Sequence, residues 1–531
     1  AQDWFAMGAV SSRDGCGSFL QRRPKQPLLQ DSTPLAKQSS LDSASWGSHE
    51  VRFNPSGLVA VHSAVDVGSV YDFEPEVLGA GMYGSVFKAT MRGSATVRAI
   101  KSIRKKQVPD SQRLFAEIDI MKQCDHPGII RLYETYEDTR RIYLIFELCT
   151  GGELYDRIVQ QGRFSERAAA GVMFQIFSAV AYLHARQICH RDLKPENFLF
   201  CSPSEDAPLK LIDFGLATEF APGKPLTTVC GTPGYASPEV FRGSYSSPCD
   251  VWACGVIMYI LLCGYPPFMG SDDIAVLKAV QRGKVQFDKL HWKQVSIAAQ
   301  ALIKSTLRLD PSRRPSATGL LTNPWLDKRV QTPRGSVSPP MVNRLRGFRR
   351  HSRFKKIALR SIVRHLDGQA VEDLKNAFFA LDVGRTGTLS VNELVKGLRT
   401  AGVPEHEVES VADSIDLDGS GRIHYSEFIA AGLQASAWQK EEVCWAAFRE
   451  FDMNGDGRIS HEDLRRVLGR ADVHPCDDDI INALIRDVDR DGSGYVEFEE
   501  FMALLSAPTR HASIVEAPAS MPIVPMGELA A

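Results

Sequence analysis

The chain has 531 residues, of which 44% are hydrophobic and 24% charged, and its formal net charge is −2. This predicts about three domains in a globular protein with unstructured ends, and excludes a chain disordered throughout. The 11 cysteines are scattered and contain no CxxC pair, which indicates reduced thiols in an intracellular protein. No secretory signal is visible, and the longest nearly apolar run, Val251 to Cys263, is too short to cross a bilayer.

Residues 1–70 are rich in Ser, Gln, Gly and Pro and have no sustained period, so we expect a disordered tail. Within it, the run from Met7 to Ser12 (MGAVSS) has the form of an N-myristoylation signal, and Cys16 is close enough for a second acyl chain. The signal works only if Met7 is the true start; otherwise the segment is an ordinary tail. We therefore expect a cytoplasmic protein that is attached to a membrane if Met7 is the start.

The first ordered pattern is a glycine-rich turn, LGAGMYGSV at residues 78–86, between two strand-like runs. Glycine lets the backbone approach phosphate oxygens without intervening side chains. Dinucleotide sites share this pattern, but here a strand follows in place of a helix, and it ends on Lys101, which can neutralise phosphate charge. Glu117 lies in a later helical run and is the type of acid that holds such a lysine extended.

The motif HRDLKPEN, followed by DFG, is much more specific. In phosphoryl transfer, Asp192 would orient the attacking hydroxyl and accept its proton, and Lys194 would offset developing phosphate charge. Asn197 and Asp213 would bind the Mg²⁺ that bridges the phosphates. Each of these residues alone has a structural alternative, but their order by chance is very improbable.

Residues 71–326 resemble a eukaryotic Ser/Thr protein kinase domain. Further matches are ASPE at the end of the activation segment, DVWACG in the central helix, and Arg314, which pairs with Glu239 in this family. The resemblance implies a two-lobed α+β fold with ATP in the cleft and Phe146 as a bulky gatekeeper. The residues that it places around the nucleotide are Leu78, Gly79, Ala80, Gly81, Met82, Tyr83, Gly84, Ser85, Val86, Ala99, Lys101, Glu147, Cys149 and Glu153.

Substrate choice is indicated at two places, and a candidate regulatory site lies nearby. Lys194 and the pair Gly231-Thr232 resemble Ser/Thr specificity. Glu153 matches the acid that pairs with a basic residue three before the target, which implies Arg-x-x-Ser/Thr substrates; the alternative is a ribose contact only. Thr228 lies where calcium/calmodulin kinases carry an activating phosphothreonine.

After a linker at 327–342, the segment 343–368 is strongly basic, with nine Arg or Lys and no acid between Asn343 and His365. Its apolar residues recur every three or four positions, which predicts an amphipathic helix. Such a helix suits an acidic, groove-forming partner or a membrane surface, and the alternative is a solvated linker helix. From Glu372 to Leu505 the chain carries 28 acidic and 13 basic residues, so the partner is expected in the same chain. Ser352, three residues after Arg349, is a candidate autophosphorylation site.

Four repeats of twelve residues, 382–393, 416–427, 452–463 and 489–500, have glycine at position six and an apolar residue at position eight. This is the EF-hand loop, in which oxygens at positions one, three, five, seven and twelve bind Ca²⁺. Four loops in register predict an all-α domain of two EF-hand pairs at 369–506, followed by a disordered tail at 507–531.

The four loops are unequal. The expected ligands are Asp416, Asp418, Ser420, Arg422 and Glu427 in the second loop, Asp452, Asn454, Asp456, Arg458 and Asp463 in the third, and Asp489, Asp491, Ser493, Tyr495 and Glu500 in the fourth. The third closes on Asp463, whose shorter side chain favours one contact to Ca²⁺ or the smaller Mg²⁺. The first has Gly384 at position three and only Thr386 at position five, so we expect it to be weak or empty, leaving three Ca²⁺ sites.

A kinase, a basic helix and four EF-hands in this order resemble the calcium-dependent protein kinases, which carry a built-in calmodulin-like domain. The resemblance implies a monomer that phosphorylates proteins using ATP and Mg²⁺. At low Ca²⁺ the junction helix would occlude the substrate site, and Ca²⁺ would open EF-hand grooves that bind the helix.

Two alternatives stay open at this point. One is a Ca²⁺-binding scaffold with an inactive kinase fold, against which the intact Lys101, Asp192, Asn197 and Asp213 argue. The other is a kinase controlled by a separate calmodulin. Nucleic-acid binding is not expected, because no aromatic-interleaved sheet or recognition helix accompanies the basic run.

Overall fold

The computed structural model describes residues 59–62, 65–81, 84–328, 337–366, 371–438, 440–468 and 478–506. The predictions made for the myristoylation signal, Cys16, Met82, Tyr83 and the C-terminal tail lie outside these residues.

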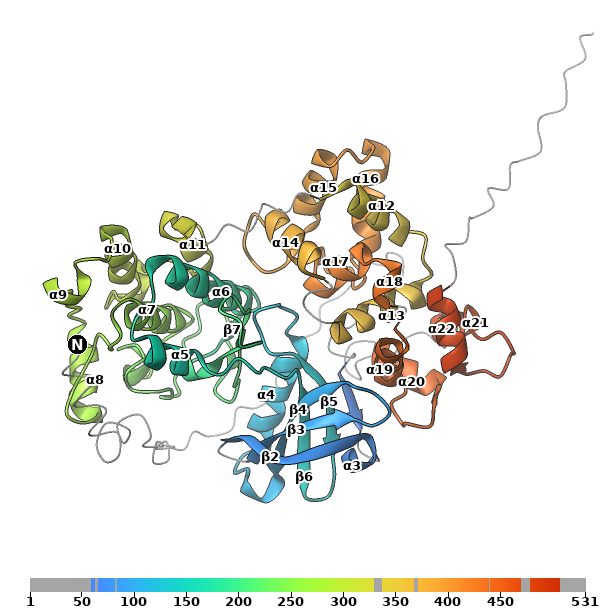
Figure 1. Cartoon of the computed structure of the whole chain (residues 1–531), viewed down its shortest axis with the longest axis horizontal. Coiled ribbons are helices and arrows are strands. Elements are labelled where there is room, and N and C mark those ends of the chain that lie inside the picture. The colour runs from blue at the N-terminus through green and yellow to red at the C-terminus, as the bar shows by residue number, and fades with distance from the viewer. Residues whose placement is uncertain are drawn as a thin grey trace, which may run out of the picture. The chain divides into compact units, whose positions relative to one another are not determined.

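The first kinase lobe is built on a six-stranded sheet in the order β1-β5-β6-β4-β3-β2 (Figure 1). Its elements are β1 (Ala60–His62), α3 (Val67–Val70), β2 (Tyr71–Gly81), β3 (Gly84–Met91), β4 (Val97–Arg104), α4 (Ser111–Gln123), β5 (Leu132–Glu137) and β6 (Arg141–Phe146). Asp110 caps α4, because its carboxylate accepts hydrogen bonds from the backbone N–H groups of Gln112 and Arg113. The sheet and α4 share one hydrophobic core with the second lobe.

The ordered structure begins before residue 71, inside the segment expected to be tail. Strand β1 pairs in parallel with β5, with Ala60 opposite Glu134, and the His62 ring stacks on Tyr136 at 4.6 Å between centroids. This strand is too short to show a period in the sequence. Its order comes from the unpaired backbone groups at the edge of β5, which accept an added strand.

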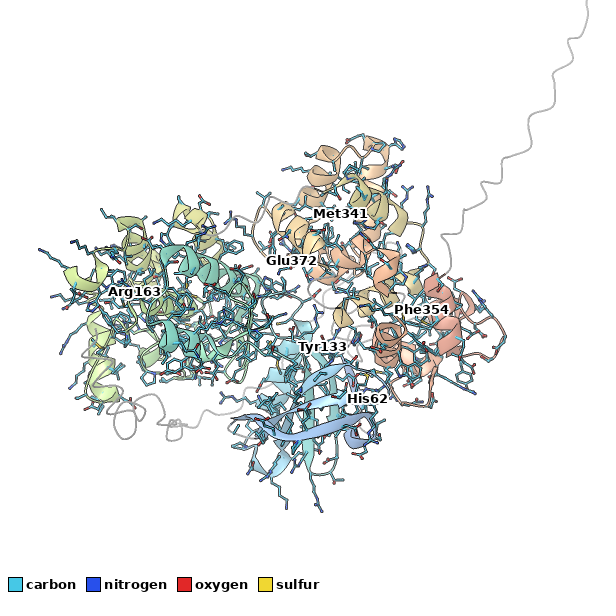
Figure 2. The ribbon with its side chains drawn as sticks, in the orientation of Figure 1. His62, Tyr133, Arg163, Met341, Phe354 and Glu372 are labelled. Atoms are coloured by element: carbon cyan, nitrogen blue, oxygen red, sulfur yellow. The ribbon has the colours of Figure 1, made fainter. Side chains whose placement is uncertain are left out.

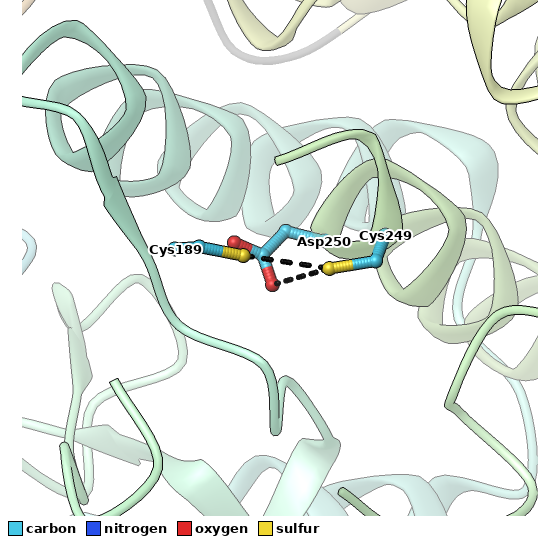
Figure 3. Close-up of side chains that lie close together, drawn as sticks. All are labelled: Cys189, Cys249 and Asp250. Carbon is cyan, nitrogen blue, oxygen red and sulfur yellow. Dashed lines mark hydrogen bonds between the residues drawn. The ribbon is translucent and has the colours of Figure 1, made fainter. Parts of the chain in front are cut away.

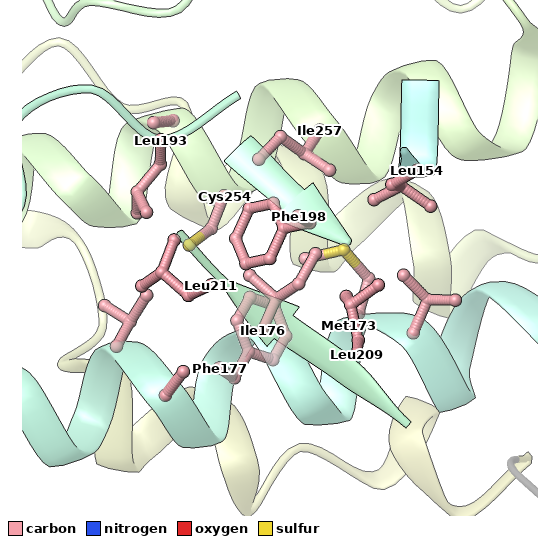
Figure 4. Close-up of a cluster of buried hydrophobic side chains, with 14 of the residues drawn as sticks. Leu154, Met173, Ile176, Phe177, Leu193, Phe198, Leu209, Leu211, Cys254 and Ile257 are labelled. Atoms are coloured by element: carbon pink, nitrogen blue, oxygen red, sulfur yellow. The ribbon is translucent and has the colours of Figure 1, made fainter. Parts of the chain in front are cut away.

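The second kinase lobe is mainly helical. Its elements are α5 (Leu154–Gln161), α6 (Glu166–Ala185), β7 (Ile188–Cys189), β8 (Phe198–Phe200), β9 (Leu209–Leu211), β10 (Thr218–Glu219), α7 (Pro248–Cys263), α8 (Asp273–Arg282), α9 (Lys289–Trp292), α10 (Ile297–Thr306) and α11 (Ala317–Leu321). Figure 4 shows its core, where Met173 and Ile176 of α6 meet Phe198 of β8 and Ile257 of α7. The apolar run in α7 is a buried core helix, as predicted. Helix α6 is long and apolar enough to span a membrane, but 67% of its most apolar window is buried in the protein, as in a core helix.

The C-terminal domain consists of helix–loop–helix units joined in two pairs, which confirms the predicted fold class. Its elements are α14 (Glu372–Leu381), β11 (Leu389–Ser390), α15 (Val391–Thr400), α16 (Glu405–Ile415), β12 (Arg422–Ile423), α17 (Tyr425–Gly432), α18 (Ala435–Trp438), α19 (Glu441–Phe451), β13 (Arg458–Ile459), α20 (His461–Leu468), α21 (Asp478–Arg486), β14 (Val496–Glu497) and α22 (Phe498–Ser506). Strand β11 pairs with β12, and β13 with β14. The pairs bring the position-eight residues together: Leu389 faces Ile423, and Ile459 faces Val496.

The basic segment forms two helices, α12 (Pro339–Phe348) and α13 (Arg353–His365), rather than the single helix expected over 343–368. The break follows from Ser352, whose hydroxyl accepts a hydrogen bond from the Lys355 N–H and so starts a new helix. Helix α12 begins inside the region expected to be linker.

Both basic helices belong to the core of the C-terminal domain (Figure 2). Helix α13 packs against α17, α19 and α22, and the Phe354 ring lies 5.6 Å from the Phe451 ring and 6.2 Å from the Phe501 ring. Buried basic side chains find acceptors there; the Lys355 ammonium, for example, donates to the Leu505 carbonyl at 2.8 Å. The segment is therefore not a solvated linker in this structure.

Candidate active site and calcium loops

The lysine predicted to meet phosphate is held by the predicted acid. Lys101 on β4 places its Nζ 3.4 Å from Oε1 of Glu117 on α4. Burial by itself would lower the pKa of Lys101, but the carboxylates of Glu117 and Asp213 raise it overall, so the ammonium stays charged. Arg113 of the same helix donates to the Gly215 carbonyl through Nε and Nη2, at 3.1 and 2.9 Å. Helix α4 is thus connected to both the lysine and the DFG segment.

Asp192, the predicted base, has a partner for each carboxylate oxygen. Lys194 Nζ lies 2.9 Å from Oδ2, and the Thr232 hydroxyl donates to Oδ1 at 2.7 Å. Lys194 also donates to Thr232 at 3.3 Å, and the Asn197 amide donates to the Asp192 carbonyl at 2.7 Å. The carboxylate is therefore oriented before a substrate hydroxyl arrives, which is what a general base requires. The sequence did not indicate the bond from Thr232.

Asp213 and Arg191 adopt left-handed backbone conformations, with φ of 61° and 69°. Such conformations cost free energy and persist where surrounding contacts enforce them, commonly at functional sites. Arg191 Nε donates to the Leu216 carbonyl at 2.6 Å. Phe214, next to Asp213, is fully buried and packs edge-to-face on His190 at 5.2 Å. These contacts hold the Asp213 carboxylate near Lys101, where the predicted Mg²⁺ ligand is needed.

A buried cluster beneath the catalytic loop contains Cys189, Cys249 and Asp250 (Figure 3). The two sulfur atoms lie 3.4 Å apart. Asp250 accepts hydrogen bonds from the backbone N–H groups of His190 and Arg191 and from His184 Nε2, each at 2.9 Å. Burial raises the pKa of the Cys189 thiol well above its usual range, so the thiol stays protonated in this arrangement. The cluster is an anchor that holds the catalytic loop from below.

The predicted nucleotide residues come together on the strands of the first lobe. In the strand register, Val86 of β3 is opposite Lys101, and Ala99 is opposite Phe146 at the end of β6. Gly84 begins β3 so close to β4 that a Cβ atom there would collide with the Ser102 carbonyl, which requires glycine.

Glu147 and Cys149, which were predicted to lie near the nucleotide, follow β6. The Glu147 carboxylate accepts from the Arg131 N–H at 2.8 Å and pairs with Lys210 Nζ at 2.8 Å. Any nucleotide contact made by Glu147 is therefore through its backbone. The hydrogen bond with the neighbouring Cys201, followed by burial, raises the pKa of Cys149, so its thiol stays protonated.

Acidic side chains gather where a basic substrate residue is expected. Glu153 starts α5, and burial followed by the charges of Asp156 and Glu196 raises its pKa. Burial also raises the pKa of Glu196, whose Oε2 has no hydrogen-bond partner among the described residues. Buried acids that repel one another favour binding a cation. Glu196 had no predicted role, because the motif that contains it does not indicate where its side chain points.

The activation segment is anchored by a buried ion pair that the family resemblance implied. Arg314 Nη1 and Nη2 lie 2.5 and 2.9 Å from the two carboxylate oxygens of Glu239. Near Thr228, the Tyr245 hydroxyl donates to the Thr228 carbonyl at 2.6 Å, and Arg191 Nη1 donates to Tyr245 at 3.2 Å.

Each EF-hand loop is already folded around its closing acid. Glu427 accepts from the N–H groups of Leu417 and His424, and Glu500 from those of Arg490 and Glu497. The remaining expected ligands of these loops are oxygen donors, which Ca²⁺ prefers, so the residues fit this ion. The carboxylate oxygens of Asp489, Asp491 and Glu500 come within 4.8 Å of one another.

In the third loop, Asp463 accepts hydrogen bonds from the same two loop positions as the longer glutamate does in the second loop. Its Oδ1 accepts from the Met453 N–H at 3.2 Å, and its Oδ2 from the Ser460 N–H at 2.9 Å. These donors occupy loop positions two and nine, as Leu417 and His424 do in the second loop. Both oxygens of Asp463 therefore face the loop.

The first loop is bridged by a cation from its neighbour. Arg422 Nε donates to the Thr388 hydroxyl at 2.7 Å, and Arg422 Nη2 donates to the Thr386 hydroxyl. Thr386 was the only side-chain oxygen expected at position five. Burial raises the pKa of Asp382 at position one to about 6. The Arg422 guanidinium on the position-five residue disfavours a divalent cation in this loop through charge repulsion.

Comparisons with known proteins agree with this arrangement. A family model described as a protein kinase domain matches residues 73–326, and one described as an EF-hand domain pair matches residues 371–431 and 440–506.

The similar proteins include enzymes of parasites and plants. Calcium-dependent protein kinase 5 of Plasmodium falciparum (isolate 3D7) is 39% identical over 446 residues, which cover 83% of this chain and 78% of that protein. Calcium-dependent protein kinase 9 of Oryza sativa subsp. japonica is 38% identical over 85% of this chain and 80% of its own length. Calcium-dependent protein kinase 7 of Arabidopsis thaliana is 37% identical over 84% of each chain. With the kinase site intact and four EF-hand loops behind it, the chain belongs to the calcium-dependent protein kinase family and is a calcium-dependent Ser/Thr protein kinase.

Proposed function

We propose that Ca²⁺ binding to the second, third and fourth loops activates this kinase by holding the basic helices α12 and α13 in the EF-hand domain, away from the substrate site. The observation that carries this proposal is the burial of Phe354 between Phe451 and Phe501 in the C-terminal core. The apolar face of α13, which a separate calmodulin would have to bind, is already covered by the EF-hand domain of this chain. This favours control within the chain over control by an external calmodulin.

At low Ca²⁺ the same basic helices block the substrate site. Arg349 and Arg350 lie between α12 and α13 and have the charge that the acids Glu153 and Glu196 attract. A segment that is attracted by both an acidic site and an apolar groove divides between the two according to its affinity for each. Ca²⁺ changes only its affinity for the groove.

The transfer step follows from the geometry of the catalytic residues. Mg²⁺-ATP, when bound, supplies the γ-phosphoryl group, and Asn197 and Asp213 would hold the metal. Lys101, extended by Glu117, neutralises phosphate charge. Asp192, oriented by Lys194 and Thr232, positions the substrate hydroxyl and accepts its proton. Glu153 and Glu196 select substrates with an arginine three residues before the target serine or threonine.

The test is phosphorylation of an Arg-x-x-Ser peptide against free Ca²⁺, without added calmodulin, in the full chain and in a version ending at Lys328. We expect a steep Ca²⁺ response from the full chain and Ca²⁺-independent activity from the short one. A full chain that is equally active at all Ca²⁺ concentrations would contradict the regulatory proposal. Stimulation only after calmodulin is added would replace it with control by a partner.

We also propose that the protein is a cytoplasmic monomer and is held at membranes if translation starts at Met7. Labelling with a myristate analogue, compared between the natural chain and Gly8→Ala, tests the lipid. Sedimentation of the purified protein with and without Ca²⁺ tests the monomer.

A further inference from the structure

The closing ligand of the second EF-hand loop is paired with a cation from the basic helix. Arg360 of α13 places Nη1 3.1 Å from Oε1 of Glu427, and its Nε donates to the Ser426 hydroxyl at 2.8 Å. The side chains of Arg360 and Glu427 are only 1% and 0% exposed, so water and salt screen this pair very little. Glu427 is the residue expected to complete the Ca²⁺ coordination with both its oxygens.

The loops of the second EF-hand pair lack this arrangement. The carboxylates of Asp463 and Glu500 accept hydrogen bonds from backbone N–H groups of their own loops. In the part of the chain that the structure describes, no ion pair involves either of these two acids. An ion pair between the closing acid and the basic helix is therefore a property of the second loop and not of EF-hand loops in general.

A second anionic partner for Arg360 lies on the kinase. Asp125 follows α4, the helix that carries Glu117, and its Oδ2 is 3.9 Å from Arg360 Nη2. The same Oδ2 accepts from the Ser426 N–H at 3.0 Å. Asp125, Arg360, Arg364 and Ser426 line one small cavity, which leaves room for the guanidinium to shift. Arg360 thus lies between a calcium ligand and a carboxylate of the kinase.

We propose that Arg360 competes with Ca²⁺ for Glu427, and that ion entry at the second loop transfers the guanidinium from Glu427 to Asp125. The inference rests on the proposed Ca²⁺ site in that loop. A divalent ion that takes both Glu427 oxygens displaces the single charge, and a buried guanidinium without an anion is costly. Asp125 supplies that anion. Ca²⁺ binding to the second loop therefore strengthens the attachment of α13 to the end of α4. By thermodynamic linkage, that attachment strengthens Ca²⁺ binding by the same factor.

The competition is tested by Ca²⁺ titration calorimetry on the full chain with the other sites disabled by Asp463→Asn and Glu500→Gln. In this background, Arg360→Met should tighten the remaining site about tenfold, because the competing charge is gone. Arg360→Lys keeps a positive charge, so its Ca²⁺ affinity should stay closer to that of the chain with Arg360. Arg346→Met is the matched control: it removes the same charge from α12, whose partner Glu407 is no calcium ligand, and should change affinity by less than about twofold. An Arg360→Met site with unchanged or weaker affinity would overturn the proposal.

The transfer to Asp125 is tested by a double-mutant cycle. Asp125→Asn alone should weaken Ca²⁺ binding about threefold or more, because the displaced guanidinium loses its acceptor. Added to Arg360→Met, it should have no further effect. Equal effects of Asp125→Asn in both backgrounds would show that Arg360 is not involved and would overturn the transfer.

Failure of the inference can be told from failure of the proposed site. Glu427→Gln in the same background should abolish the remaining Ca²⁺ binding. If binding survives that change, the second loop is not the site and both proposals fall. If Glu427→Gln abolishes binding but Arg360→Met has no effect, only the competition is wrong.

Discussion

The catalytic centre and the calcium loops use their carboxylates in different ways. Around Asp192, charged and hydroxyl side chains occupy both oxygens before any substrate is present. In the fourth loop, Glu500 accepts hydrogen bonds from two backbone N–H groups of its own loop, and Asp491 is exposed. A general base needs one orientation, whereas an ion site needs oxygen lone pairs that remain open to the ion. The second loop departs from this pattern because Arg360 binds its closing acid.

Replacing the catalytic carboxylate of Asp192 should have the largest effect on activity. Asp192→Asn removes the proton acceptor while keeping the amide shape, and should lower kcat about 10³-fold. Peptide phosphorylation at saturating Ca²⁺ measures it. Ca²⁺ titration of the same variant should match the natural chain, and a variant with a tenth or more of the original activity would refute the assigned role.

Replacing a closing acid of a calcium loop should have the next largest effect. Glu500→Gln removes a charged ligand from the fourth loop and should weaken that site about 100-fold. The matched variant in the first loop, Glu393→Gln, should leave the number of Ca²⁺ ions bound unchanged, because that loop is not expected to hold one. Calorimetry compares the two. A loss of one bound ion in Glu393→Gln would show that the first loop is a real site.

A stability test probes the anchor below the catalytic loop. Asp250→Asn should lower the free energy of unfolding by about 3 kcal/mol, because it leaves the half-buried His184 and two loop N–H groups without their buried anion. Burial alone would raise the pKa of Asp250, but bonding to His184 lowers it to about 2, below the ordinary value of 3.8.

The pH dependence of that difference follows from the depressed pKa. A carboxyl with a lowered folded-state pKa contributes stability above its ordinary pKa and loses that contribution as the pH falls through the folded value. The gap between the natural chain and Asp250→Asn in denaturant unfolding should therefore be constant from pH 7 to about pH 4 and shrink below that. A gap that closes already near pH 6 would point to a different group.

The smallest expected effect sharpens the contrast within the first EF-hand pair. Arg422→Ala removes the exposed bond to Thr386 and the part-buried bond to Thr388 but keeps the backbone carbonyl expected to bind Ca²⁺ in the second loop. It should cost about 0.5 kcal/mol of stability. Thermal unfolding measures this, and a loss several times larger would mean that Arg422 organises the whole pair.

The local features of the fold and the site were readable from residue spacing. Asp192, Lys194 and Asn197 lie within a few positions of one another, so a motif defines their relative places. The EF-hand loops are similar: ligands, turn glycine and closing acid all fall inside twelve residues. The helix break at Ser352 was missed although its cap is local, because the apolar and basic period continues across it.

The kinase and EF-hand chemistry, the order of the domains and the amphipathic character of the basic segment are predictable from residue patterns, because they depend on residues that are near in the chain. The added strand β1, the charge of Glu196 near Glu153, the contact of Arg422 with the first loop, and the place of Arg360 between Glu427 and Asp125 are visible only in the folded protein. Each of these brings together residues far apart in sequence. The residue type gives the charge of a side chain, but the partner of that charge depends on which distant element packs against it and excludes water from the pair.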